Sequence, residues 1–185
     1  SAGLHILAMG LMLCDHLWAT VVPGNDWLTC IGRLAFPIFA FLIVEGYFHT
    51  GNLKRYVLRL LVCAVISEIP FNLMVGSRVV YPIHQNVLWT FLLGLGLIHW
   101  NEKAAQAKPW RRVLRAVSSV ILGTLVGTLT MVDYYGAGVV MVLIFYFFRQ
   151  RNWQNLLLQV LALYYVNVEM LGGLGYEVVV FGRTL

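Results

Sequence analysis

The sequence predicts an all-α fold, in which a polytopic bundle of transmembrane helices forms a single integral membrane domain over residues 1–185. Its composition is the first observation: 60% of the residues are hydrophobic and 11% are charged, whereas soluble domains average about 45–50% and about 25%. The mean hydropathy of +0.78 agrees with this. The second observation is a series of apolar segments close to the length of about 20 residues that a spanning helix needs. The expected surrounding of the chain is therefore a lipid bilayer.

About seven segments are the expected spans. The first has no basic region and no cleavage motif before its apolar run, so it predicts a retained helix and not a removed signal peptide. The sixth is short enough to be a re-entrant piece instead, and the seventh contains Asn167 and Glu169. The tail 172–185 begins Gly-Gly-Leu-Gly, turns apolar and stops, so we expect it to be the incomplete start of a further element. The expected spans are 4–22, 27–48, 56–75, 85–101, 115–132, 136–149 and 154–171.

The distribution of Lys and Arg predicts the orientation of the bundle. Of the 13 basic residues, nine lie in the connections 49–55, 102–115 and 149–153, and the alternate connections hold only Arg78. Because short cytoplasmic loops are enriched in Lys and Arg, these three connections and the N-terminus are expected in the cytoplasm. Topology then explains the net charge of +5. No basic stripe alternates with aromatic residues, so no nucleic-acid partner is expected.

Polar residues from four of the expected helices fall at one depth in the outer half of the bundle. At a rise of about 1.5 Å per residue, this level lies roughly 5–10 Å below the outer boundary. Two of the residues have i, i+4 spacing and therefore share one helix face. We expect all the residues at this level to converge on one cavity. Their charged and amide side chains would form the catalytic cluster. The residues at this level are Asp15, His16, Arg33, Glu68, Asn72, Gln85 and Asn86.

The cost of burying charge favours this convergence. A lone Asp or Arg at membrane depth costs about 2.5–3.5 kcal/mol on insertion scales, so such residues usually face the bundle interior and pair. Arg33 is expected to pair with Asp15 or Glu68. Pro37 has no N–H to donate to the Arg33 carbonyl, which should bend or loosen the second span at this point. The alternative is a purely structural network of ion pairs and hydrogen bonds, although simple helix association requires fewer polar side chains.

A second polar set lies near the cytoplasmic boundary. Glu45 and His49 end the second span, Lys54 and Arg55 occupy the turn, and Arg59 follows one helical turn later. Basic residues at this boundary usually determine topology and extend toward lipid phosphates, which is the simpler interpretation for the turn. The deeper residues would form a structural pair or a site for an anionic ligand that enters from the cytoplasm.

The remaining motifs predict packing. The three cysteines lack the spacing of a zinc site, so no metal is expected. Gly123 and Gly127 form a small-x-x-x-small motif, which allows close packing within the bundle or, alternatively, a homodimer. The outer turn 133–135, Asp-Tyr-Tyr, is expected to be solvated, with contact to a substrate as the alternative.

Four ordered motifs carry a resemblance to a known family. They are MGLMLCDHLW, IGRLAFPIFAFLIVEGYFHTGNLKRYVLRLL, ISEIPFNL and HQNVLWTFLLGL, within residues 5–98. The chain resembles the TraX family of membrane proteins, which is associated with N-terminal acetylation of conjugative pilin. That family is more distantly similar to the acyltransferase-3 type enzymes, which move an acetyl group from cytoplasmic acetyl-CoA to an acceptor on the far side. The resemblance implies a multi-pass protein of the bacterial inner membrane and an acetyltransferase.

The resemblance also implies roles for the polar residues. His16 would be the general base that deprotonates the acceptor, since imidazole titrates near neutrality. Asp15 would set its tautomer or protonation, and Arg33, with Asn72 or Asn86, would stabilise the oxyanion. The acceptor would be a protein N-terminus, a sugar or a small molecule. The remaining candidates are Glu68 in the catalytic cluster and Glu45, Lys54, Arg55 and Arg59 for acetyl-CoA.

Two alternative functions remain open on the sequence. A proton-coupled secondary transporter or permease would use buried Asp, His, Glu and Arg side chains as its substrate and proton site. Transporters commonly contain paired repeats, whereas the polar residues of this chain are concentrated in residues 4–101. A non-catalytic scaffold is the other alternative, and it would leave the buried charges without a purpose.

Overall fold

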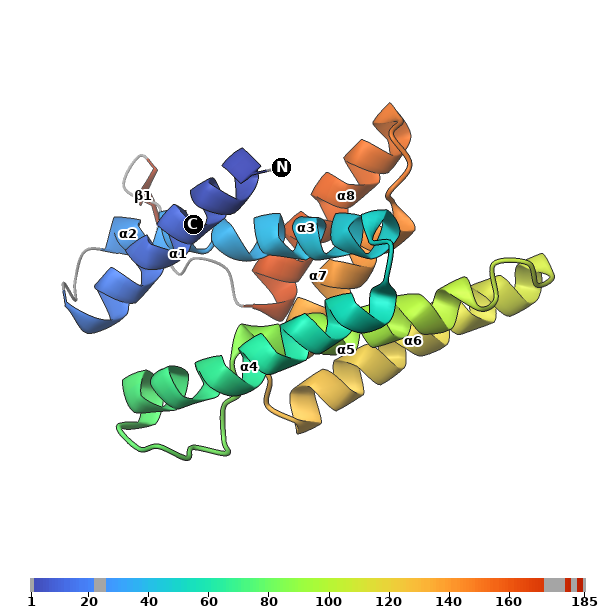
Figure 1. The fold of residues 1–185 in the computed structure, drawn as a ribbon. Coiled ribbons are helices and arrows are strands. Elements are labelled where there is room, and N and C mark those ends of the chain that lie inside the picture. Colours follow the sequence, from blue (N-terminus) through green and yellow to red (C-terminus); the bar gives the residue numbers. More distant parts are fainter. Residues whose placement is uncertain (1, 22–25, 172–178, 181–182, 185) are drawn as a thin grey trace.

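The computed structural model describes residues 2–21, 26–171, 179–180 and 183–184. It is an all-α bundle, as the sequence predicts, and a pair of two-residue antiparallel strands follows the helices (Figure 1). Most of the tail 172–185, which was expected to begin a further element, lies outside the described residues. The elements are α1 (Ala2–Thr20), α2 (Asp26–Gly32), α3 (Ala35–His49), α4 (Leu53–Gly76), α5 (Val87–Glu102), α6 (Pro109–Leu129), α7 (Tyr135–Phe147), α8 (Trp153–Tyr165), the π-helix η1 (Val166–Met170), β1 (Val179–Val180) and β2 (Arg183–Thr184).

Each of the seven expected spans corresponds to one helix or to one helix pair. Four stretches are long and apolar enough to cross a membrane, namely α1, Trp27–His49, α4 and α6. The helices α5, α7 and α8 are shorter, with 16, 13 and 13 residues. The transmembrane bundle therefore combines long outer helices with shorter ones, and α7 is a short apolar helix that lies inside it.

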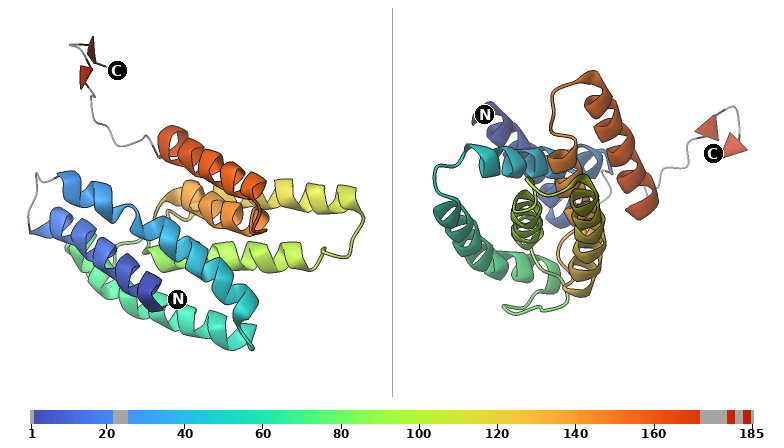
Figure 2. Two further views of the ribbon diagram at one scale, coloured as in Figure 1. Left: turned by 90° about the horizontal axis from the view of Figure 1, so that it is seen from above. Right: turned by 90° about the vertical axis from the view of Figure 1, so that its right-hand side faces the viewer.

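The helix α7 forms the centre of the bundle. It contacts α3, α5, α6 and α8, and Figures 1 and 2 show it between these helices. Most of its residues are buried between these helices, which explains why nearly all of them are apolar, although Tyr135 at its start is exposed. The core that they form with α3 and α5 includes Phe36, Ala40, Val44, Phe91, Ile98, Met141, Val142 and Leu143.

Small residues allow α6 and α7 to approach closely. A Cβ atom added at Gly127 would lie 2.9 Å from the Tyr135 carbonyl oxygen, and one added at Gly136 would lie 2.6 Å from that of Thr124. Gly123 is also buried, against Val139 and Leu97. The predicted use of the Gly123-x-x-x-Gly127 motif for packing within the bundle is therefore confirmed.

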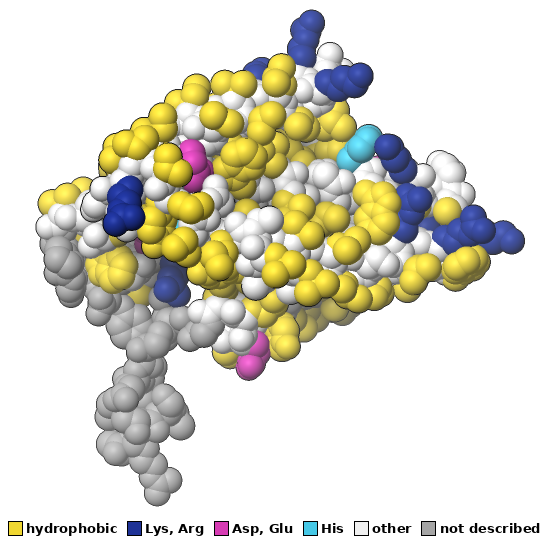
Figure 3. All heavy atoms as spheres, turned by 90° about the horizontal axis from the view of Figure 1, so that it is seen from below, with side chains coloured by type: hydrophobic (Ala, Val, Ile, Leu, Met, Phe, Trp, Pro, Cys, Tyr) yellow, Lys and Arg dark blue, Asp and Glu magenta, His cyan; other side chains and the backbone are white. Residues whose placement is uncertain are grey.

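The outer surface of the bundle is apolar and its basic residues gather toward one end. Long side chains on α1, α4, α6 and α8 are exposed, for example Ile6, Ile66, Leu129 and Leu157. Figure 3 shows this apolar surface, with most of the visible Lys and Arg side chains toward the end that carries the α3–α4 and α5–α6 connections. Apolar surface of this extent fits contact with lipid. The basic end is the predicted cytoplasmic end.

The second expected span is interrupted at Arg33 and Leu34, as predicted from Pro37. The helix α2 ends at Gly32 and α3 begins at Ala35. Pro37 cannot donate a hydrogen bond to the Arg33 carbonyl, so the regular ladder is broken there. A Cβ atom at Gly32 would lie 2.5 Å from the Asp15 Cβ, so only glycine lets α2 pack this closely on α1. Arg33 follows Gly32 directly, so the close contact of Gly32 with Asp15 holds this part of the chain against α1.

Candidate functional site

Two adjoining cavities lie at the predicted outer end of the bundle. The first, here called the α4-side cavity, has a volume of about 330 Å³ and is lined by side chains of α1, α3, α4, α5 and the α6–α7 turn. The second, called the α8-side cavity, has a volume of about 300 Å³ and reaches η1. The two cavities share Asp15, Phe36, Asp133 and Tyr134.

Four of the predicted catalytic residues, Asp15, His16, Arg33 and Asn86, line these cavities. Asp15 faces both, and its Oδ1 accepts a hydrogen bond of 2.8 Å from the Thr29 hydroxyl. His16 lines the α4-side cavity and Arg33 lines the α8-side cavity. The structure therefore brings an imidazole, a carboxylate and a guanidinium to one level.

Asn86 also lines the α4-side cavity, but its amide has structural partners. Its Nδ2 donates to the Ala64 carbonyl at 2.9 Å and to Glu68 Oε2, and its Oδ1 accepts from the Leu88 N–H at 3.0 Å. The last contact caps the N-terminus of α5. Both amide hydrogens of Asn86 are thus occupied, so an oxyanion would have to displace one of these partners.

Glu68 and Asn72 lie behind the cavity lining, on the face of α4 that packs toward α5. Glu68 Oε2 accepts from the Trp89 indole at 2.9 Å as well as from Asn86. Asn72 is 4% exposed and donates to the Val79 carbonyl at 3.2 Å. Glu68 Oε1 and Asn72 Oδ1 are buried, and neither accepts a hydrogen bond from any residue that the structure describes.

Two residues outside the predicted set join the site. His84 Nε2, from the α4–α5 connection, lies 3.5 Å from Asp133 Oδ1 in the α6–α7 turn. The hydrogen bond with Asp133 raises the pKa of His84 above its ordinary value; the negative charges of Asp133 and Glu68 act in the same direction, and partial burial opposes them. Both residues line the α8-side cavity, with Arg33 and Asp15.

Backbone hydrogen bonds join the two connections that carry this pair. The Gln85 N–H donates to the Met131 carbonyl, and the Asp133 N–H donates to the Gln85 carbonyl, both at 2.9 Å. The Thr90 hydroxyl donates to the Asp133 carbonyl at 2.7 Å. The backbones of Gln85 and Asp133 therefore hold the two connections together, in addition to the contact between the His84 and Asp133 side chains.

The α6–α7 turn has an unusual backbone. Met131, Tyr134 and Tyr135 all have positive φ angles, 52°, 59° and 49°. Bulky residues rarely adopt this conformation, and such strain is concentrated at functional sites. The Tyr134 ring packs on Phe36, with the centroids 4.3 Å apart. Asp133 and Tyr134 are partly buried and line the cavities, whereas Tyr135 is exposed, so the turn is solvated as predicted only in part.

The predicted residues for acetyl-CoA separate into two groups. Glu45 Oε1 accepts a hydrogen bond of 2.9 Å from Arg149 Nε, and its other oxygen lies 3.6 Å from His49. Lys54, Arg55 and Arg59 are exposed on α4 and line neither of the two outer cavities. Within the described ranges, no three His, Cys, Asp or Glu side chains come together as a metal site requires.

Comparisons with known proteins relate the chain to a curated protein and to a protein family. The probable fimbrial assembly protein FimC, serogroup H1, of Dichelobacter nodosus is 33% identical over 77 residues, which cover 40% of this chain and 32% of that protein. The chain thus matches about a third of the length of this curated relative. No solved structure matches the chain. The family model described as TraX protein matches residues 1–180, and the chain therefore belongs to the TraX family.

Proposed function

We propose that this protein is an integral membrane acetyltransferase, which moves an acetyl group from cytoplasmic acetyl-CoA to an amine or hydroxyl acceptor at the outer side. One observation carries the proposal: His16, Arg33 and the His84–Asp133 pair line two cavities that share Asp15. Acyl transfer to an acceptor needs groups that move protons and a group that stabilises the oxyanion. The two imidazoles, one of them held by a carboxylate, can move protons, and the guanidinium can stabilise the oxyanion.

The reaction forms a bond between the acceptor and the acetyl carbon, breaks the carbon–sulfur bond of the thioester and moves one proton from the acceptor to sulfur. The acceptor nitrogen or oxygen attacks the thioester carbon, and the tetrahedral intermediate carries its negative charge on the carbonyl oxygen. Collapse of this intermediate breaks the carbon–sulfur bond. The acceptor loses a proton and the departing thiolate gains one, so the products are the acetylated acceptor and CoA thiol, with no oxidant or metal required.

Each group has a role that its position supports. His16, in the α4-side cavity, takes the proton from the acceptor as general base. Arg33, in the α8-side cavity, stabilises the oxyanion. His84 faces the same cavity as Arg33, and the Asp133 carboxylate favours its protonated form, so it donates a proton to the leaving thiolate.

The α4-side cavity suits an acceptor with an apolar end. Much of its lining is apolar, including Met12, Phe39, Phe71, Met74 and Leu88. The relative described as a fimbrial assembly protein and the resemblance to proteins of pilin acetylation both support a pilin-like polypeptide N-terminus as the acceptor. A free α-amino group has an ordinary pKa of about 7.7–8.0, which a neutral imidazole can deprotonate at physiological pH.

The test is an acetyl-transfer assay on the purified protein in lipid nanodiscs. Labelled acetyl-CoA is supplied with a set of acceptors, namely peptides with free N-termini, amino sugars and small amines, and both free CoA thiol and transferred label are measured. We expect release of thiol and transfer of label to depend on the acceptor. His5→Gln, at the other end of α1 and outside both cavities, is the matched control for His16→Gln. Absence of transfer to every acceptor, with proton-linked uptake in liposomes, would instead identify a permease.

A further inference from the structure

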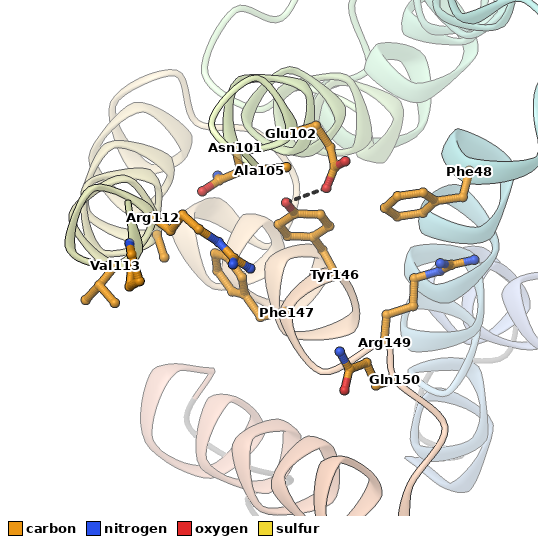
Figure 4. A pocket seen from close by; sticks show the side chains of 12 residues that line it. Phe48, Asn101, Glu102, Ala105, Arg112, Val113, Tyr146, Phe147, Arg149 and Gln150 are labelled. Atoms are coloured by element: carbon orange, nitrogen blue, oxygen red, sulfur yellow. Dashed lines mark hydrogen bonds between the residues drawn. The ribbon is translucent and has the colours of Figure 1, made fainter. Parts of the chain in front are cut away.

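Two more cavities lie at the predicted cytoplasmic end. The larger, called the inner cavity, has a volume of about 500 Å³ and lies between the ends of α3, α5, α6 and α7 (Figure 4). The other, called the groove cavity, has a volume of about 470 Å³ and lies between α3, α7 and α8. Arg149 and Gln150 line both, so the two cavities adjoin at these residues.

The inner cavity combines cationic and aromatic groups. The Arg149 guanidinium carbon lies 4.0 Å from the centroid of the Phe48 ring, and in Figure 4 the Arg112 guanidinium points toward the rings of Tyr146 and Phe147. Guanidinium groups bind phosphates through paired N–H donors, and aromatic rings stack on nucleobases. The volume is within the range of about 300–1,000 Å³ that is usual for small-molecule sites. This is the chemistry of a site for a phosphorylated nucleotide.

The acidic residues of this region have partners of their own. Glu102 accepts a hydrogen bond of 2.8 Å from the Tyr146 hydroxyl, and Glu45 accepts from Arg149 Nε. An arginine has five N–H donors, so the contact with Glu45 leaves donors of Arg149 for a ligand. Arg151 adds a further positive charge in the groove cavity.

The groove cavity continues toward the outer site. On α3 it reaches Phe41, while the α8-side cavity begins at Pro37, four residues away. On α7 the corresponding residues are Phe145 and Met141, again four residues apart. Four residues of a helix span about 6 Å. The two cavities therefore lie about one helical turn apart along α3 and α7, and along α8 and η1 their nearest lining residues, Gln159 and Asn167, are eight residues apart.

The length of the groove matches the reactive arm of CoA. Glu45, which holds Arg149, is twelve residues from Arg33 along the chain, which corresponds to about 18 Å of helix. The arm between the phosphate and the sulfur of CoA contains about 13 bonds and, at about 3.8 Å for each three bonds, extends about 16 Å. A nucleotide held at Arg149 would thus bring its thioester to the level of Arg33.

We propose that the inner cavity binds the phosphorylated nucleotide end of CoA between Arg112 and Arg149, and that the arm follows the α3–α7–α8 groove to Arg33. The destination of the arm rests on the proposed acetyltransferase function, whereas the nucleotide site stands on the inner cavity alone. The shared chemistry is a phosphate-bearing anion, and the headgroup of an anionic lipid is the other source of such a group.

The first test measures binding of adenosine 3′,5′-bisphosphate and of CoA to the protein in phosphatidylcholine nanodiscs. We expect both to bind and to compete, and each of Arg112→Gln and Arg149→Gln to weaken both by about tenfold or more, since a hydrogen bond to a charged group is lost. Arg111→Gln is the matched control, because Arg111 is adjacent on α6 and does not line the inner cavity. Melting temperatures identify any variant that fails to fold, and Arg149→Lys keeps the charge where Arg149→Gln is unstable.

The second test separates the groove from the nucleotide site. Leu156→Trp, in the lining of the groove cavity, is expected to weaken CoA and leave adenosine 3′,5′-bisphosphate unaffected, because only CoA has the arm. Leu157→Trp, next to it and outside the lining, is the matched control. Equal effects on the two ligands, or no effect on CoA, would overturn the path along the groove.

Other outcomes are equally decisive. If the bisphosphate does not bind in phosphatidylcholine discs, or binds as tightly to both arginine variants, the nucleotide site is excluded. Arginine-dependent retention of phosphatidylglycerol without nucleotide binding would identify a lipid headgroup site instead. Nucleotide binding without acetyl transfer to any acceptor would support the nucleotide site and contradict the proposed acetyltransferase function. Acetyl transfer with unchanged CoA affinity in the arginine variants would support the acetyltransferase function and contradict the nucleotide site.

Discussion

His84 Nε2 lies 3.5 Å from Asp133 Oδ1, although the two residues belong to connections that are 49 positions apart in the chain. The α4–α5 connection and the α6–α7 turn meet through backbone hydrogen bonds at Gln85, so the contact is built into the fold. His84 also packs on Phe71, with the ring centroids 5.6 Å apart. A carboxylate that holds an imidazole over a cavity is the arrangement that orients histidines for proton transfer.

The first prediction is a pH-dependent stability that depends on this pair. The Asp133 contact raises the pKa of His84 above its ordinary value of 6.5, so the protonated ring stabilises the folded state. This contribution is complete below the ordinary pKa and is lost as the pH rises through the higher folded-state pKa. We expect the Tm in nanodiscs to fall as the pH rises above 6.5 and Asp133→Asn to flatten that fall.

Asp133→Asn has a second expected effect, on the reaction. If His84 donates the proton to the thiolate, the variant should move the alkaline limb of the kcat profile to lower pH, because the protonated form is lost earlier. His99→Gln, outside both outer cavities, serves as the control. An unchanged profile in Asp133→Asn would return the pair to a structural role.

The second prediction concerns His16. As general base it should contribute about 10²–10⁴-fold to the rate. His16→Ala and His16→Gln should therefore lose most acetyl transfer to a similar degree, while both proteins keep their Tm and bind CoA. A structural histidine predicts a different order, in which Gln is tolerated and Ala lowers the Tm. Full activity in His16→Gln, with an unaltered pH profile, would remove His16 from the mechanism.

The bundle could be predicted from the sequence because composition and apolar length report directly on the surrounding solvent. The length rule was least informative for α7, which has 13 residues. Since α3, α5, α6 and α8 enclose it, α7 is stabilised by packing and need not match the thickness of the bilayer. The interruption at Arg33 was predictable from Pro37 because a missing N–H acts locally.

The residues of the candidate site could be predicted only where a polar residue lies within an apolar membrane-spanning segment. Asp15 and His16 lie on an apolar helix and Arg33 lies between two apolar helices, so their cost of burial reveals them in the sequence. His84 and Asp133 lie in connections, where polar residues are ordinary and only the tertiary contact at Gln85 gives them a role. The sequence predicted the depth of Asn86 correctly. The direction of its amide depends on hydrogen bonds to Glu68 and Ala64, and residue spacing does not predict these partners.

The third prediction tests Arg33 as the group that binds the oxyanion. Removal of one such donor costs about 10²–10³-fold in kcat. Arg33→Gln should therefore lower kcat with a small change in the KM for acetyl-CoA, because the interaction forms mainly in the transition state. Arg78→Gln, in the α4–α5 connection and outside the two outer cavities, is the matched control. A rise in KM alone would make Arg33 a binding residue instead.

The last prediction separates a structural from a catalytic role for Asn86. Its amide hydrogens are used by Ala64 and Glu68, and its carbonyl oxygen caps α5. Asn86→Ala removes the cap and leaves the partly buried Glu68 carboxylate short of a donor, so we expect a loss of about 2 kcal/mol in the free energy of unfolding.

At temperatures well below its melting point, the folded fraction of Asn86→Ala should keep a kcat near that of the unmodified protein. The oxyanion role makes the opposite prediction, a loss of about 10²-fold or more in kcat with the Tm nearly unchanged. Chemical denaturation in mixed micelles and initial rates normalised to the folded fraction measure the two quantities independently. Trp89→Phe provides an internal comparison, because it also removes a donor to Glu68 Oε2 but lies outside the linings of both outer cavities. Similar losses of stability in the two variants, with kcat retained in both, would assign Asn86 to the support of α5 and leave Arg33 as the oxyanion donor.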